Sequence, residues 1–262
     1  MKYSLILNLY HYRHYIWRNA WSELRHRYAG TGMGIFWNLL HPLVEIMTYT
    51  LVFSLLFSHR THGIMSYRLY ITSGVLTWGV FTSSVQRGSN TFIEHSRYLK
   101  QLNLPLEIFV AKIILTFTLI LHIYYCLFLL TSTLLGNPLQ WKFLLLPIFL
   151  ILLQVLALGM TLILAHLRVL FPDVKEMLQA FITLWRWTLP VIYPEEVLPE
   201  SLRRWLFLNP PYVFLRSIRA LILEHALPGW QDWLIMGIWI FLLLGCGMIV
   251  THKLQHDVRE SL

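Results

Sequence analysis

Charged residues are scarce in this chain, and their scarcity excludes most soluble proteins. Only 13% of the 262 residues are charged, whereas 56% are hydrophobic and the mean hydropathy is +0.57. A soluble domain has about 25% charged and about 45–50% apolar residues. Half the usual charge cannot cover a soluble globule of this length. We therefore predict a protein that is solvated by lipid.

Catalytic motifs are lacking as well. The sequence contains no P-loop, no H-E-x-x-H, no G-x-S-x-G and no C-x-x-C. Its two cysteines, Cys126 and Cys246, lie in apolar runs and indicate no disulfide framework. The pair His252 and His256 has no carboxylate or cysteine cluster beside it, which favours solvated histidines over a metal site. We predict a chain that is not itself an enzyme and binds no metal or cofactor, so any uphill transport would draw energy from a partner or an ion gradient.

Residues 1–30 predict an amphipathic helix that lies in the membrane interface. Apolar residues recur at steps of three and four from Leu5 through Ile16 to Leu24, and basic residues such as Arg13 and Arg18 lie between them. An ordinary helix that packs on a soluble partner is the alternative. A glycine-rich segment then ends the helix, because glycine disfavours helix interiors.

Apolar stretches long enough to cross a membrane fill most of the remaining chain. A span needs about 20 apolar residues, and five candidates lie at about 35–57, 69–86, 108–135, 142–166 and 175–192. A sixth lies at 233–252. The predicted fold is an all-α integral membrane protein, a single transmembrane domain over 1–262 with six transmembrane helices. The N-terminal interface helix and a re-entrant helix pair before the last span complete it.

Basic residues set the predicted orientation. The net charge of +8 is better explained by cytoplasmic loops than by a nucleic-acid surface. With the N-terminus inside, most lysines and arginines face the cytoplasm, and the short outer loops hold only Arg60, Arg68 and Lys142. We therefore predict that both termini are cytoplasmic.

The segment 193–230 does not fit a simple bundle. Asn209-Pro210-Pro211 divides it into two short apolar helical runs, 201–208 and a second run that reaches about His225. Irregular backbone at membrane depth is tolerated only against protein or a water-filled cavity. We predict a re-entrant pair that borders a pathway on the outer side. An additional full span is the alternative, although neither run reaches 18 uninterrupted apolar residues.

Polar and aromatic side chains inside the spans predict a substrate channel. In the first span, Glu45 shares a broad helical face with aromatic residues at steps of four, and a carboxylate there normally faces a bundle interior or a cavity. Rings with hydroxyl groups suit carbohydrate, although helix packing explains each residue equally well. The candidate channel residues are Trp37, Glu45, Tyr49, Phe53, Trp78, Phe81, Trp185, Arg186 and Trp187.

Several segments, taken in chain order, carry a family resemblance. Residues 27–37 read RYAGTGMGIFW, His41-Pro42-Leu43 follows, and residues 170–176 read LFPDVKE. Pro190-Val191-Ile192-Tyr193 and Leu208-Asn209-Pro210 complete the set. The ordered set resembles the permeases of type-two ABC exporters for bacterial polysaccharides, most closely those for O-antigen. Met33 and Pro172 depart from this pattern, where leucine and arginine are usual.

The resemblance implies a homodimer with two separate ATP-binding cassette subunits, which would hold the ATP and Mg. It implies a channel between the two copies and an outer gate that contains Tyr193, Glu195, Glu196, Asn209 and Pro210. It also implies that the interface helix and the first cytoplasmic loop dock on the ATPase. The residues expected at that contact are Arg25, Arg27, Tyr28, Glu94, His95, Arg97, Tyr98 and Lys100.

The function that the resemblance implies is export of a lipid-linked polysaccharide, of O-antigen type, across the bacterial inner membrane. Capsular polysaccharide and teichoic acid export are close alternatives that these residues do not separate. A drug or small-lipid exporter of the same superfamily is a second class. An integral membrane acyl- or glycosyltransferase is a third, and the absence of a clustered acid/base or metal site weighs against it.

Overall fold

The computed structural model describes residues 5–27, 31–56, 64–101 and 104–262, and every regular element within these ranges is a helix. The long helices are α2 (Arg13–His26), α3 (Trp37–Leu56), α4 (Ile64–Ser89), α7 (Glu107–Leu134), α8 (Leu146–Leu170), α9 (Val174–Trp185), α11 (Pro210–Arg219) and α12 (Trp230–Ser261). The short α-helices are α1 (Leu5–His11), α5 (Thr91–Glu94), α6 (Ser96–Gln101) and α10 (Glu200–Trp205). Single turns of 3₁₀-helix are η1 (Gly34–Phe36), η2 (Trp141–Leu145), η3 (Arg186–Thr188), η4 (Glu195–Val197) and η5 (Leu206–Leu208), and η6 (Ala220–Glu224) is a π-helix.

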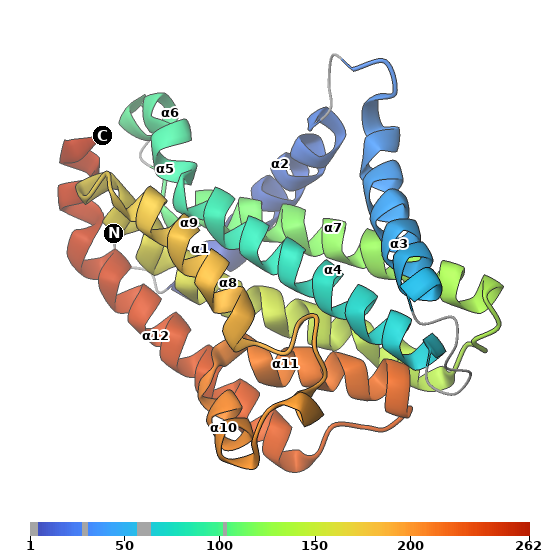
Figure 1. The fold of residues 1–262 in the computed structure, drawn as a ribbon. Helices are drawn as coiled ribbons and strands as arrows, with labels where there is room; N and C mark the ends of the chain where they lie inside the picture. Colours follow the sequence, from blue (N-terminus) through green and yellow to red (C-terminus); the bar gives the residue numbers. More distant parts are fainter. Residues whose placement is uncertain (1–4, 28–30, 57–63, 102–103) are drawn as a thin grey trace.

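Helix α8 lies at the centre of the bundle and packs against α4, α7, α11 and α12, as Figure 1 shows. The closest approach is its crossing with α12. A Cβ atom added at Gly159 would lie 2.6 Å from the carbonyl carbon of Leu243, and one added at Gly247 would lie 2.9 Å from the carbonyl oxygen of Gly159. Glycines on both helices therefore let the two backbones touch, the usual device of helix pairs in membranes.

The N-terminal segment forms two helices rather than one, because the chain bends at Tyr12 between α1 and α2. The predicted apolar face is present on α2, where Ile16, Ala20 and Leu24 are buried. That face packs against α7, and Trp17 and Trp21 remain exposed. Placement of α2 in the membrane interface stays a prediction, since its apolar face is used for contact within the subunit.

Helices α3, α4, α7 and α8 begin and end within a few residues of the first four predicted spans. Among the described residues, three helical segments are long and apolar enough to cross a membrane: Glu107–Leu134, Trp141–Leu170 and Trp230–Ser261. The pair Glu200–Leu208 and Pro210–Glu224 adds a fourth if it counts as one broken span. The prediction of six spans therefore extends beyond the helices that meet this test.

Two of the predicted spans differ in length from their helices. The fifth was expected over 175–192, but α9 has 12 residues, about 18 Å of helix, and the turn η3 ends the helical run at Thr188. The last was expected to end near residue 252. Instead α12 continues for 32 residues to Ser261, so the polar tail is helical. Polar side chains at i and i+4, such as His256 and Glu260, satisfy one another along this extension.

Candidate functional site

Arg219 on α11 organises the segment that the sequence predicts as an outer gate. Its side chain is buried, and Nη1 donates to the carbonyl oxygen of Pro190 at 2.5 Å. Nη2 donates to the carbonyl oxygens of Val191 at 2.8 Å and Tyr70 at 3.0 Å. The guanidinium carbon also lies 3.5 Å from the centre of the Tyr70 ring, a cation–π contact. One arginine therefore joins α11, α4 and the chain that follows α9.

Gly74 provides the space for this contact on α4. A Cβ atom at Gly74 would lie 2.2 Å from Nη2 of Arg219 and 2.4 Å from the carbonyl oxygen of Val191. No other residue type fits there without displacing the arginine. The carbonyl groups of residues 190 and 191 lie outside a regular helix, so they depend on donors such as Arg219 for hydrogen bonds at this depth.

The predicted helix break at Asn209 is present, and the chain bends there by 106° between the two helical runs. Asn209 accepts a 2.8 Å hydrogen bond from Nε1 of Trp185 and donates one of 3.1 Å to the hydroxyl of Thr188. Its side chain does not cap α11, and Pro210 occupies the first turn of that helix, where no N–H donor is needed. Asn209 thus ties the break to the end of α9.

The other predicted gate residues gather beside this break. The Tyr212 hydroxyl donates to the carboxylate of Glu195 at 2.8 Å, and the Tyr193 hydroxyl donates to the carbonyl oxygen of Trp187 at 2.8 Å. Glu195 and Glu196 line a cavity of about 430 Å³ whose wall also includes Arg219. Of the predicted gate residues, Glu195 and Glu196 therefore share a cavity with Arg219, which the sequence analysis did not select, whereas Asn209 and Pro210 lie at the other end of α11.

The predicted channel residues divide into two groups. Trp78, Phe81 and Trp185 are buried and pack on one another, with ring centroids 5.3–6.0 Å apart in three edge or tilted contacts. They belong to the core of the single chain. A direct substrate contact by these three side chains would require that core to open.

The second group lies nearer the surface, between α3 and the end of α9. Trp187 is 66% exposed, and Arg186 lies close enough to Glu45 for an electrostatic interaction, which His41 shares. No ion pair or hydrogen bond joins Arg186 and Glu45 among the described contacts, so their interaction acts at longer range. Trp37 and Tyr49 are partly buried on the same helix as Glu45. Phe53 also lies on α3, but its side chain is outside the described part of the structure.

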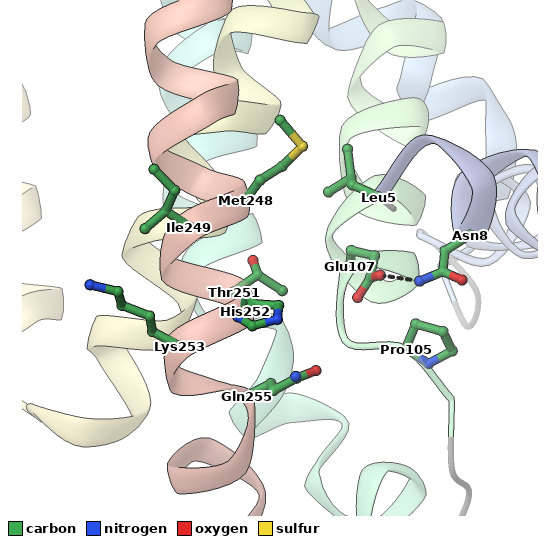
Figure 2. A pocket seen from close by; sticks show the side chains of 10 residues that line it. All are labelled: Leu5, Asn8, Pro105, Glu107, Met248, Ile249, Thr251, His252, Lys253 and Gln255. Carbon is green, nitrogen blue, oxygen red and sulfur yellow. Dashed lines mark hydrogen bonds between the residues drawn. The ribbon is translucent and has the colours of Figure 1, made fainter. Parts of the chain in front are cut away.

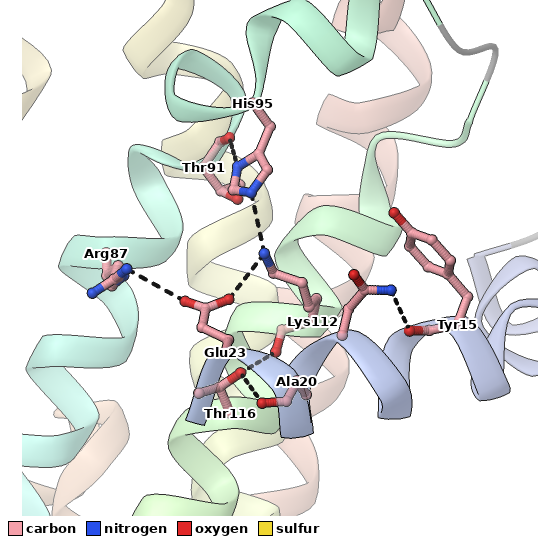
Figure 3. Close-up of polar contacts among 9 residues, drawn as sticks. Tyr15, Ala20, Glu23, Arg87, Thr91, His95, Lys112 and Thr116 are labelled. Atoms are coloured by element: carbon pink, nitrogen blue, oxygen red, sulfur yellow. Dashed lines mark hydrogen bonds and ion pairs between the residues drawn. The ribbon is translucent and has the colours of Figure 1, made fainter. Parts of the chain in front are cut away.

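A polar cluster joins four elements of the chain (Figure 3). We call it the coupling cluster and define it as Glu23, Arg87, His95 and Lys112. The Glu23 carboxylate lies 2.9 Å from Nζ of Lys112 and 3.4 Å from Nη2 of Arg87. Lys112 in turn lies 3.1 Å from Nε2 of His95. The cluster thereby links α2, α4 and α7 to the loop that contains α5 and α6.

The tautomer of His95 follows from its two partners. A lysine ammonium group only donates, so Nε2 of His95 accepts, and Nδ1–H donates to the carbonyl oxygen of Thr91 at 2.9 Å. Burial, followed by the nearby Lys112 charge, lowers the pKa of His95 from its usual 6.5. The cluster therefore uses a neutral histidine, and protonation would place two cations in contact.

The remaining predicted coupling residues surround this cluster without joining it. Arg25, Glu94, Arg97, Tyr98 and Lys100 are exposed. Arg27 is exposed at the end of α2, with its guanidinium carbon 5.4 Å from the centre of the Phe117 ring. Tyr28 lies outside the described residues. Docking of an ATPase on these exposed side chains stays a prediction.

The C-terminal helix holds the same loop from the other side. Arg259 on α12 donates from Nη1 to the carbonyl oxygen of Leu99 at 3.4 Å, and from Nη2 to the carbonyl oxygen of Leu104. The loop is thus fixed to both ends of the chain, through Glu23 near the N-terminus and Arg259 near the C-terminus.

Comparison with known proteins decides the family. The family model described as ABC-2 type transporter matches residues 14–223, from α2 to η6. The chain belongs to the ABC-2 type transporter family. The matched range contains the coupling cluster and the predicted outer gate segment. Helices α1 and α12 lie outside it.

Similarity to individual members of this ABC-2 family extends over almost the whole chain. An O-antigen export system permease protein, RfbA, of Myxococcus xanthus is 25% identical over 260 residues, which cover 98% of this chain and 99% of that protein. Two RfbA proteins of Klebsiella pneumoniae carry the same description and are each 23% identical over 92% of both chains. The family and the apolar helices identify a membrane-embedded protein, as the sequence analysis predicted.

The sequence analysis of this ABC-2 chain missed Glu23, Arg87, Lys112 and Arg219 as functional candidates. One signal was present: Glu23 is the only acidic residue among the first 40, in a helix rich in arginine and histidine. A single carboxylate in such a setting indicates a specific partner. For Arg219 the sequence offered no comparable signal, because its partners are backbone carbonyl groups.

Proposed function

We propose that this chain is the membrane channel subunit of an ATP-driven exporter that moves a lipid-linked polysaccharide of O-antigen type across the bacterial inner membrane. The observation that carries the proposal is similarity over 92–98% of the chain to three proteins described as O-antigen export permeases. The absence of a P-loop from the sequence supports a separate ATPase. That partner would hold the ATP and Mg.

The proposed assembly is a homodimer of six-span subunits with both termini in the cytoplasm and two ATPase subunits beneath. Large apolar side chains on α9 and α10 support a second copy, because Leu184 and Trp205 are 70% and 66% exposed in the isolated chain. Both residues precede the bend at Asn209 in the chain: Leu184 lies near the end of α9 and Trp205 ends α10. An exposed apolar surface of this kind suits a contact between subunits within the membrane.

Coupling is the first step of the proposed mechanism. The ATPase would dock on the exposed residues of α2 and of the loop that contains α5 and α6, and its closure would move both elements. Because Glu23 and His95 both contact Lys112, that motion would reach α7 through one ammonium group. Partly buried charge pairs transmit force well, since breaking them exposes charge to a poor solvent.

The second step is passage of the glycan between the two copies. Trp37, Glu45, Tyr49, Phe53, Arg186 and Trp187 are the proposed lining, from α3 and the end of α9. Trp78, Phe81 and Trp185 would support this lining from behind, as buried packing residues. Aromatic faces and a fixed charge pair allow a sugar chain to slide, because each sugar makes weak and replaceable contacts.

The third step is opening of the outer gate. The bent pair on either side of Asn209 would swing away from the end of α9, with Glu195 and Glu196 at the exit. The hydrogen bonds that Asn209 makes with Trp185 and Thr188 are the contacts that this movement would break. They link the gate directly to the proposed lining.

The experiment is deletion of the gene, followed by localisation of surface polysaccharide and of its lipid-linked precursor. We expect the precursor to accumulate inside the cell and surface glycan to disappear, with recovery when the intact gene is restored. Chemical analysis of the trapped glycan then distinguishes O-antigen from capsular polysaccharide and teichoic acid. Normal surface glycan without internal accumulation would overturn the proposal in favour of a drug or small-lipid exporter.

Trp187→Ala tests the lining itself, with Trp230→Ala as the matched control. Both tryptophans are strongly exposed, at 66% and 72%, but Trp230 lies at the start of α12, away from the proposed lining. We expect Trp187→Ala to reduce export while ATP hydrolysis and assembly persist, and Trp230→Ala to leave export unchanged. Equal effects of the two substitutions would argue against a channel at Trp187.

A further inference from the structure

A cavity of about 340 Å³ lies between α1, the beginning of α7 and the second half of α12 (Figure 2). Leu5 and Met248 face one another at one end of it. Towards the other end, Thr251, His252 and Gln255 point from α12 towards Asn8 and Glu107. The cavity is therefore amphipathic, with an apolar end and a polar end only a few residues apart.

The position of the cavity on α12 indicates the boundary between lipid and water. Helix α12 is the most exposed of the three candidate spans, since 17% of its most apolar window is buried, against 44% and 56% for the other two. Its apolar surface ends at Ile249 and Val250, and Thr251, His252 and Lys253 follow. A change from apolar to polar residues along a lipid-facing helix marks the level of lipid headgroups.

Glu107, in the first turn of α7, gives the polar end a carboxyl group. Glu107 is only 8% exposed. One of its carboxyl oxygens accepts a 2.6 Å hydrogen bond from the side-chain amide of Asn8, which is also buried. Among the described residues, no lysine, arginine or histidine forms an ion pair with Glu107. Lys253 also lines the cavity, but Figure 2 shows its side chain extending from α12 on the side away from Glu107. Figure 2 shows the second oxygen of Glu107 turned towards the cavity. The N-terminus of α7 favours a carboxylate at this position, and an ammonium group in the cavity would donate to the second oxygen.

We propose that this cavity binds one aminophospholipid of the inner leaflet, of the phosphatidylethanolamine class. The ammonium group of the lipid would donate to the free oxygen of Glu107, and His252 and Gln255 would serve the phosphate. The acyl chains would pass Leu5 and Met248 and continue along the exposed apolar surface of α12. An anionic lipid without an amine is disfavoured by the Glu107 charge, and a quaternary ammonium lipid has no N–H group to donate.

This site is independent of the proposed export function, because it lies outside the predicted channel and gate. It would fix the short helix α1 to α7 and α12 at the membrane surface. The bound lipid would then act as a structural ligand that stabilises the folded state by mass action.

The test is lipid retention by the purified full-length protein. Detergent-solubilised protein is stripped of lipid and mixed with phosphatidylethanolamine, phosphatidylglycerol or phosphatidylcholine, and bound lipid is counted by native mass spectrometry. The apparent melting temperature is measured in parallel. We expect one retained phosphatidylethanolamine and a higher melting temperature with that lipid alone. Equal retention of phosphatidylglycerol or phosphatidylcholine would overturn the proposal.

Two variants locate the site. Glu107→Gln keeps a carbonyl oxygen that can accept from Asn8 but removes the charge, and we expect the affinity for phosphatidylethanolamine to fall about tenfold, as loss of one charge-assisted hydrogen bond implies. Met248→Trp narrows the apolar end from a partly exposed position and should also reduce retention. Glu260→Gln, exposed on the same helix, is the control and should retain the lipid. Unchanged retention in both cavity variants would place the lipid elsewhere.

Discussion

Lys112 on α7 places its ammonium nitrogen 2.9 Å from Oε2 of Glu23 on α2, although the two residues are far apart in the sequence. Their side chains are only 11% and 17% exposed, so solvent screens this pair less than a surface salt bridge. The contact joins α2 to α7, one of the three helices long and apolar enough to cross a membrane. In the proposed exporter it is a polar route from the docking surface to α7.

Glu23→Gln is expected to reduce export for each ATP hydrolysed. The substitution removes the charge that holds Lys112 and Arg87, and coupling energies of about 0.5–3 kcal/mol are usual for residues in one network. A loss in the middle of that range corresponds to about tenfold. The measurement is the ratio of exported glycan to ATP consumed by the reconstituted complex. Glu176→Gln is the control, since its pair with Lys175 is solvent-exposed, and an equal loss in both variants would contradict a specific role of Glu23.

Gly74→Ala is expected to disrupt the contacts of Arg219. The added methyl group would lie 2.2 Å from Nη2 of Arg219, and overpacking of this kind costs about 1–3 kcal/mol. Gly79→Ala on the same helix meets no atom within 4 Å and should be neutral or stabilising. Thermal unfolding of the two purified variants tests the difference. Equal melting temperatures would show that Arg219 has room to move.

Gly159→Ala is expected to separate α8 from α12. Its methyl group would meet the backbone of residues 243 and 244 at 2.6–2.9 Å, and backbone atoms have little freedom to yield. Gly237→Ala on α12 meets nothing within 4 Å and serves as the matched substitution. We expect a lower yield of monodisperse protein for Gly159→Ala alone, measured by size-exclusion chromatography after membrane extraction. Normal yields for both would mean that the crossing tolerates a wider spacing.

The lowered pKa of His95 predicts that the folded protein loses stability in mild acid. Because the folded pKa of His95 is lowered from 6.5, the unfolded state takes up a proton first as the pH falls. The stability contributed by neutral His95 is thus complete above pH 6.5 and declines as the pH falls from 6.5 towards the lowered folded pKa. His95→Gln should flatten the melting temperature between about pH 7.5 and pH 5.5. A profile as steep as that of the original protein would assign the acid sensitivity to another group.

Local chemistry explains the parts of the fold that could be predicted from the sequence. Hydropathy located α7 and α8 to within a few residues, because a long apolar run in lipid has to form a helix. Asn209-Pro210-Pro211 predicted the break before α11, because proline removes backbone donors and fixes its own φ. The family resemblance also depended on short ordered motifs, and the match over residues 14–223 confirmed it.

Packing decided the features that the sequence analysis missed. Aromatic side chains inside apolar spans marked Trp78, Phe81 and Trp185 as channel residues, but such side chains are as common on a buried face as on a channel face. The early end of α9 followed from the contacts of Trp185 and Thr188 with Asn209, which come from opposite sides of a long connection. Sequence periodicity describes one helix at a time and does not indicate which other helix packs against each face.

The sequence alone determined that this protein is helical, lies in a membrane and resembles the permeases of ABC exporters, since these properties depend on composition and on motifs within short segments. Only the tertiary structure decided that Lys112 meets Glu23 and His95, and that Arg219 holds the carbonyl groups of Pro190 and Val191. The physical reason is distance along the chain. A buried charge needs a partner, but hydropathy and spacing do not specify which remote residue the folded backbone brings within 3 Å.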